Sequence, residues 1–196
     1  MENKFKKVQV DKPLSELTPL DITCKSSRCE ENLHSFHLNK RELKKYNGNR
    51  VCKDCGEDLI DWERIRRRDL NDKDFTINSM KKELFRQVFW DNEIEKEAIL
   101  KAQKSTCKQL KDKAKKLIKQ KIGQAQNFHE GYQTKKNGNE IVNYAQHATG
   151  TCCRNCLEYW HGIKKGTVLT DPELEFCADM AMLYIEKKVP DIAKEN

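Results

Sequence analysis

The chain has 196 residues, of which 37% are hydrophobic and 35% are charged, and it carries nine cysteines and a formal net charge of +7. This composition argues against one large apolar core, and no stretch approaches the 18 or more apolar residues of a membrane-spanning helix. The positive charge is moderate and does not by itself indicate nucleic-acid binding. A chain with so modest a core often gains stability from metal cross-links.

The N-terminal residues 1–10 are polar and lysine-rich, without the apolar segment of a secretory signal. We therefore expect an intracellular, cytoplasmic protein without a membrane segment. Thiols stay reduced there, so closely spaced cysteines indicate metal binding rather than disulfides.

The sequence predicts an α-rich α+β fold in four segments. These are a flexible arm (1–20), a small zinc-ribbon-like module (21–70), a helical pair with a lysine-rich face (71–124), and a Cys/His-stabilised helical cap with a C-terminal helix (125–196). The oligomeric state is not predicted.

The first cysteine cluster has the spacing C-x4-C followed by C-x2-C-G, and its members are Cys24, Cys29, Cys52 and Cys55. Two short chelating loops from separate segments suit a tetrahedral zinc ion, and four thiolates leave no position for a substrate water. We therefore predict a structural zinc site. Two alternatives remain open: His34 or His37 could replace Cys24 or Cys29, or the cysteines could be free and partly buried.

Helical spacing of apolar residues predicts the middle of the chain. One helix is expected to begin at Asn78, and a second to run from Asp91 to Gly123. Residues 140–145 are expected to form a short strand or to lead into the second cysteine cluster. The last helix is expected to have Asp171 as its N-cap, with Pro172 in the first turn and Pro190 after its end.

Two groups of basic residues are candidates for contact with nucleic-acid phosphates. One is an arginine run beside Trp62, and the other is a face of the lysine-rich helix. Their members are Arg64, Arg66, Arg67 and Arg68 in the first group, and Lys108, Lys111, Lys115 and Lys119 in the second. Arginine beside an aromatic ring suits phosphate and base contacts, whereas lysines would contribute contact with the backbone and no base readout. A solvated surface is the alternative for both.

The second cluster places three cysteines and two histidines within fifteen residues: His147, Cys152, Cys153, Cys156 and His161. We predict a second zinc site made by Cys153, Cys156, His161 and one of His147 or Cys152. In one alternative, Cys156 and Trp160 are core residues of a helix. In another, the surplus ligands form a catalytic site with an open position or a reactive thiolate.

Residues 146–163 resemble an uncharacterised family of bacterial and phage proteins, defined by a domain of unknown function with the motif QHATxTCCRxCLExWHGI. The likeness continues to a Leu-Thr-x-x-Glu helix start at Leu169, Thr170 and Glu173. An upstream Gly-x-Gln-Thr is matched by residues 131–134, so that the resemblance covers residues 131–188. It implies no known activity.

These features predict a small protein that binds two zinc ions and contacts nucleic acid or docks onto a nucleic-acid-handling complex, with conflict between phage and host as one setting. One alternative is a metal-dependent nucleic-acid-processing or hydrolytic enzyme that uses His147 or His161 beside the second metal. The other is a module that only binds proteins.

Overall fold

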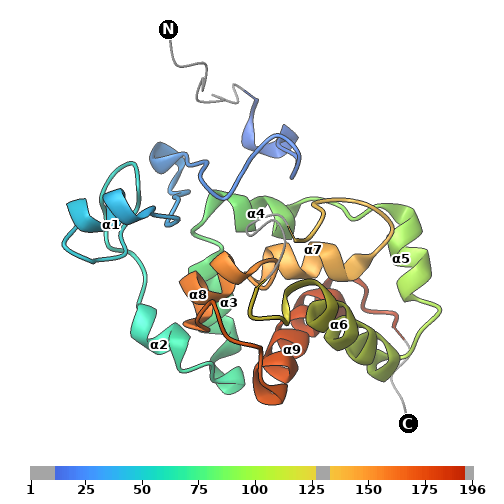
Figure 1. Ribbon diagram of the computed structural model, residues 1–196. Helices are drawn as coiled ribbons and strands as arrows, with labels where there is room; N and C mark the ends of the chain where they lie inside the picture. The colour runs from blue at the N-terminus through green and yellow to red at the C-terminus, as the bar shows by residue number, and fades with distance from the viewer. Residues whose placement is uncertain (1–11, 127–132, 193–196) are drawn as a thin grey trace, which may run out of the picture.

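The computed structural model describes residues 12–126 and 133–192 (Figure 1). The helices within these residues are, in chain order, η1 (Leu14–Glu16), η2 (Cys29–Glu31), α1 (Lys40–Lys45), α2 (Trp62–Arg66), η3 (Leu70–Asp72), α3 (Lys73–Met80), α4 (Leu84–Asp91), α5 (Lys96–Ala102), α6 (Cys107–Ile122), α7 (Ile141–Ala148), α8 (Arg154–His161) and α9 (Asp171–Lys188). None of the described helices is long and apolar enough to cross a membrane.

β-Structure in the described residues is limited to two isolated bridges, Arg28 with Leu33 and His34 with Glu83. The expected α-rich character is therefore confirmed. The segment predicted as a zinc-ribbon-like module, residues 21–70, contains turns and short helices such as η2 and α1, and its β-structure is limited to these bridges. The helix α1 begins there because Asn39 and Glu42 form a reciprocal capping box.

The main body is built around α9, which packs against α6 and α7, while α7 also packs against α4 (Figure 1). The face of α9 that packs into the core includes Leu174, Cys177 and Tyr184, which are all buried. Its N-cap is Thr170 and not the expected Asp171. The Thr170 hydroxyl and the Glu173 carboxylate cap each other's backbone N–H groups, with proline in the first turn.

Residues 140–145 do not form a strand, because Ile141–Ala148 is the helix α7. All eight of its residues are buried. A short segment that is buried on every side gives no periodic signal to separate a helix from a strand.

The other helix boundaries also differ from expectation. Asn78 lies inside α3 and caps nothing, and α4 starts separately after Glu83. The helix predicted from Asp91 to Gly123 is divided into α5 and α6, because Thr106 and Gln109 form a capping box that starts a new helix.

An aromatic cluster joins the N-terminal segment to α8. The Trp62 ring centroid lies 5.1 Å from those of Tyr159 and Trp160, and the Phe36 centroid lies 6.1 Å from that of Trp160. Leu17, in the segment predicted as a flexible arm, is also buried against the main core. Residues 1–11 of that arm lie outside the described residues, as do residues 131 and 132 of the Gly-x-Gln-Thr motif.

Candidate metal centres

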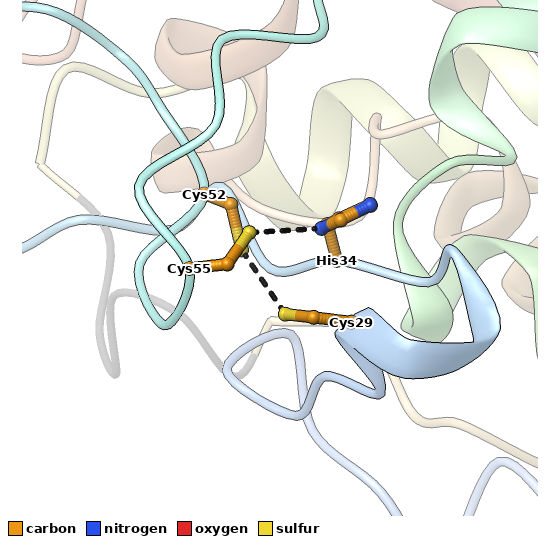
Figure 2. Close-up of side chains that lie close together, drawn as sticks. All are labelled: Cys29, His34, Cys52 and Cys55. Atoms are coloured by element: carbon orange, nitrogen blue, oxygen red, sulfur yellow. Dashed lines mark hydrogen bonds between the residues drawn. The ribbon is translucent and has the colours of Figure 1, made fainter.

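The first candidate centre brings together Cys29, His34, Cys52 and Cys55, whose ligand atoms all lie within 4.8 Å of one another. Figure 2 shows the four side chains pointing toward one another. Three of the predicted cysteines are thus adjacent. Cys24 is not part of the group, and His34 provides the fourth donor, as the histidine alternative anticipated.

The distances within this group suit a tetrahedral ion. Zn–S bonds of about 2.3 Å place two sulfurs about 3.8 Å apart, and a Zn–N bond of about 2.0 Å places nitrogen about 3.5 Å from sulfur. The Sγ atoms of Cys29 and Cys52 are 3.7 Å apart, and Cys55 Sγ lies 3.5 Å from His34 Nδ1 (Figure 2). The donor set and its spacing therefore fit zinc.

Local backbone structure positions the two sulfurs of the C-x2-C loop. The Gly56 N–H donates to the Cys52 carbonyl at 2.9 Å, and the Cys52 N–H donates to the Glu57 carbonyl at 2.8 Å. Gly56 has φ +81°, which residues with a side chain rarely adopt. The chain therefore turns back directly after the second cysteine.

His34 reaches the group from a segment that is fixed to the start of α4. Its N–H donates to the Lys82 carbonyl at 2.8 Å, and its carbonyl accepts from the Leu84 N–H at 3.0 Å. This pairing joins the first centre to the helical body. Sequence spacing contains no information about it.

The thiols of the first centre differ in acidity. Burial raises the pKa of Cys52, but hydrogen bonds from the backbone of Cys55 and Ser35 outweigh that effect and lower it to about 6. Burial and the neighbouring Cys52 raise the pKa of Cys29 to about 12. The Cys52 thiol is therefore the more readily ionised of the two, whereas Cys29 would release its proton to solvent when a metal binds.

The second candidate centre consists of Cys152, Cys153 and Cys156, which are all buried and have sulfurs within 4.8 Å of one another. Cys153 is the N-cap of α8, and its Sγ accepts from the Cys156 N–H at 3.4 Å. The C-x2-C pair Cys153 and Cys156 thus lies at a helix N-terminus, where negative charge is favoured.

A buried arginine from α4 lies against this second centre. The Arg86 guanidinium donates to Cys156 Sγ at 3.1 Å and forms an ion pair with Glu83 at 2.9 Å. Hydrogen bonds from Cys152 and Cys153, together with the charge of Arg86, hold the pKa of Cys156 well below its usual value. Neither Arg86 nor Glu83 is among the site residues predicted from the sequence. The only signal for them was a charged pair, three residues apart, at the start of an apolar helix.

Neither predicted histidine lies in the second three-sulfur group. The Nε2 atoms of His147 and His161 lie 3.1 Å and 2.9 Å from the carbonyls of Thr134 and Thr149. Burial lowers the pKa of His147 to about 3 and that of His161 to about 4. Both rings are therefore neutral at pH 7, and each connects its own helix to a nearby backbone carbonyl through a hydrogen bond.

The candidate arginines form contacts within the chain. Arg64 pairs with Asp72 at 2.6 Å, Arg66 donates to the Tyr159 carbonyl at 3.1 Å, and Arg68 lies 3.6 Å from Glu173. Arg67 reaches Glu63 only at 4.0 Å, and its side chain is 66% exposed. Of this run, Arg67 is the residue most open to an external phosphate.

The lysine face is divided by the packing of α6 on α9. Lys111 pairs with Glu175 and Asp179 at 2.5 and 2.6 Å, and Lys115 pairs with Glu175 at 2.8 Å. Lys108 and Lys119 are exposed. Two of the four predicted lysines thus face acidic side chains of the same molecule, and the other two face solvent.

The fold and the two centres define a helical protein with two cysteine-rich groups, each of which could hold a metal ion. A family model described as "Domain of unknown function (DUF4186)" matches residues 74–186. The chain belongs to this family, which confirms the predicted membership of an uncharacterised domain family. No solved structure matches the chain. The matched region contains the second centre, and the first centre lies before it.

Proposed function

We propose that this is a zinc-binding protein with two zinc sites, which presents an exposed lysine stripe on α6 to nucleic-acid phosphates. The observation that supports the metal most directly is the spacing of the donors Cys29, His34, Cys52 and Cys55. Thiolate and imidazole in a tetrahedral arrangement favour zinc over magnesium or calcium, which prefer oxygen ligands. Four protein donors fill the coordination shell, so we assign the first zinc a structural role.

The state of the cysteines fits this proposal. None of the nine, all of which lie within the described residues, is joined in a disulfide. Reduced thiols are typical of a reducing compartment, and we propose the cytoplasm.

The nucleic-acid part of the proposal rests on Lys108 and Lys119, with Lys116 exposed beside them on α6. Lysines that face solvent can release counterions from a phosphate backbone, whereas Lys111 and Lys115 are already neutralised by α9. Such contacts would position the protein on nucleic acid without reading its sequence.

Elemental analysis of the purified chain tests the metal assignment, with two zincs per chain expected. One zinc, unchanged in a Cys153→Ser/Cys156→Ser variant, would remove the second site from the proposal. Absence of zinc from protein purified without chelators would overturn the proposal as a whole.

The phosphate contact is tested by measuring the salt dependence of binding to a duplex and to a single strand. Lys108→Gln/Lys119→Gln should weaken binding and reduce the slope of log K against log salt by up to about 0.9 for each lost contact on a duplex. Lys111→Gln/Lys115→Gln removes the same charge and is the matched control, because those lysines face α9. Equal losses in both variants would reject the lysine stripe as the binding surface.

A hydrolytic enzyme is the second candidate, and the three-sulfur second centre is the observation that favours it. Catalytic zinc sites keep one position for water beside three protein ligands. If that position is open, azide should change the visible spectrum of the cobalt-substituted protein. An unchanged spectrum would argue against catalysis at this centre.

A further inference from the structure

We propose that Cys24 is the fourth protein ligand of the second centre, so that a metal held by Cys152, Cys153 and Cys156 has a closed four-thiolate shell. This inference rests on the proposed metal-binding function and goes beyond it. It assigns the ligand that distinguishes a structural site from a catalytic one, and it links the N-terminal segment to α8.

Backbone contacts bring the segment that leads into Cys24 toward the second centre. Cys24 itself lies outside the three-sulfur group, so the proposal requires its sulfur to move onto the metal when the site is loaded. Lys136 Nζ donates to the carbonyl of Ile22, and Thr134 Oγ1 donates to the carbonyl of Cys152 at 2.8 Å. Residues 134–136 therefore form a short bridge, with the segment leading into Cys24 on one side and the first cysteine of the second centre on the other.

A second contact fixes Cys24 from the opposite direction. Ser35 Oγ donates to the Cys24 carbonyl at 3.1 Å, and the Cys24 side chain packs against the main hydrophobic core. The residue next to Ser35 is paired with the start of α4, which also carries Arg86. Cys24 is thus held between the strand-like segment at 33–35 and the region around Arg86.

The electrostatic surroundings of Cys24 agree with this placement. Burial and the nearby charges of Cys156 and Glu83 raise the pKa of Cys24, while Arg86 acts in the opposite direction. Arg86 in turn is influenced by Cys156, Cys152 and Cys24 together. One buried guanidinium therefore lies within electrostatic range of thiols from both segments.

The thiol of Cys24 is also available. His34 occupies the fourth place in the first centre, and among the described residues Cys24 Sγ forms no hydrogen bond that would commit it elsewhere. Zinc with four thiolates carries a net charge of about −2. The buried Arg86 would offset part of that charge, which gives a reason for an arginine in an otherwise apolar environment.

His37 is the rival donor, because it also lies within range of the Cys156 charge. Its ring, however, packs against Tyr159 with centroids 5.6 Å apart. A closed shell through His37 would contain three sulfurs and one nitrogen, the same donor set as the first centre. The two assignments therefore differ in a property that spectroscopy measures.

The experiment uses the full chain with its metals exchanged for ¹¹³Cd. The cadmium chemical shift separates four-sulfur from three-sulfur, one-nitrogen sites, and couplings from cadmium to cysteine β-protons identify each ligand. We expect one signal of each type, with Cys24 coupled to the four-sulfur signal. Coupling of the second site to Cys152, Cys153 and Cys156 without Cys24 would overturn the inference and leave the two-site proposal intact. A complete lack of cadmium binding would instead overturn the proposed function.

Variants provide an independent measurement. Cys24→Ala should lower the metal affinity of the second site at least tenfold and leave the first site unchanged. Cys107→Ala is the matched control, since Cys107 is also half-buried and packs against the same core. Loss of second-site affinity in His37→Ala, with Cys24→Ala unaffected, would assign the position to His37.

Alkylation of the native protein keeps the test valid if Cys24→Ala fails to fold. As a chelator is added, Cys24 should become reactive at the same chelator concentration as Cys152, Cys153 and Cys156. If Cys24 is alkylated while those three remain protected, it is not a ligand.

Discussion

Nη2 of Arg86 lies 3.1 Å from Sγ of Cys156, and both side chains are buried between α4 and α8. The same guanidinium donates to the His147 carbonyl and pairs with Glu83, whose carboxylate accepts from Trp160 Nε1 at 3.2 Å. A single charged residue thus connects α4, the end of α7 and the second candidate metal centre.

Replacing Arg86 by methionine should destabilise the protein by roughly 3–5 kcal/mol, because it leaves the buried Glu83 without its partner. Burial already raises the pKa of Glu83 to about 7, so adding Glu83→Gln should recover part of the loss. Urea denaturation of the two single variants and the double variant measures this coupling. Additive losses would show that the ion pair is not the origin of the effect.

The Arg86→Met variant should also bind metal at the second centre roughly 10–100-fold more weakly, because the guanidinium stabilises the Cys156 thiolate. Arg154→Met is the control. Arg154 is equally buried, but it donates to the carbonyls of Lys164 and Thr167. Competition with a chromophoric chelator gives both affinities. A similar loss in the two variants would indicate a general effect of destabilisation.

Cys52→Ser or Cys55→Ser should remove one zinc per chain and unfold the first centre, since structural zinc contributes on the order of 10 kcal/mol to folding. Cys177→Ser serves as a control, because this buried thiol lies on α9, in a separate part of the core and outside both centres. Elemental analysis combined with hydrogen exchange over residues 21–70 measures the two effects. A variant that retains its metal and its exchange protection would contradict the assignment of the first site.

His34→Ala should remove the metal from the first centre, and His34→Cys should retain it with four sulfurs. The reason is that Nδ1 of His34 occupies the fourth donor position, 3.5 Å from Cys55 Sγ. Visible spectra of the cobalt-substituted variants measure the donor set through the intensity and position of their bands. Normal metal content in His34→Ala would show that His34 is not the fourth ligand of the first centre.

The stability of the protein should fall between pH 6.5 and about 4, in part through His161. Burial lowers the pKa of this ring from 6.5 to about 4, so the unfolded chain binds the proton first as the pH falls. The stabilising effect of the neutral ring is complete above pH 6.5 and lost progressively below it, by up to about 1.4 kcal/mol per pH unit.

His161→Gln, which retains a donor for the Thr149 carbonyl, should make the stability curve shallower over that range. Urea denaturation at pH 7.5 and 5.5 gives the two slopes, and comparing variant with wild type subtracts the common effect of acid on the thiolates. Parallel curves would mean that His161 does not titrate on unfolding.

The amino-acid sequence by itself determined the features that depend on neighbours in the chain. The C-x2-C pairs are brought together by local backbone geometry, and the start of α9 follows from Thr170 and Glu173 three residues apart. The helical character of residues 171–188 follows equally from spacing and capping. These features need no knowledge of the rest of the fold.

Only the tertiary structure decided which distant groups meet. His34 enters the first centre, and Cys24 lies outside it, because the backbone of His34 pairs with residues 82–84 at the start of α4. Lys111 and Lys115 form ion pairs within the chain, and are not open to an external phosphate, because α6 packs against the acidic residues of α9. Local spacing fixes angles and distances over a few residues, whereas a contact between remote segments depends on the packing of all the elements between them.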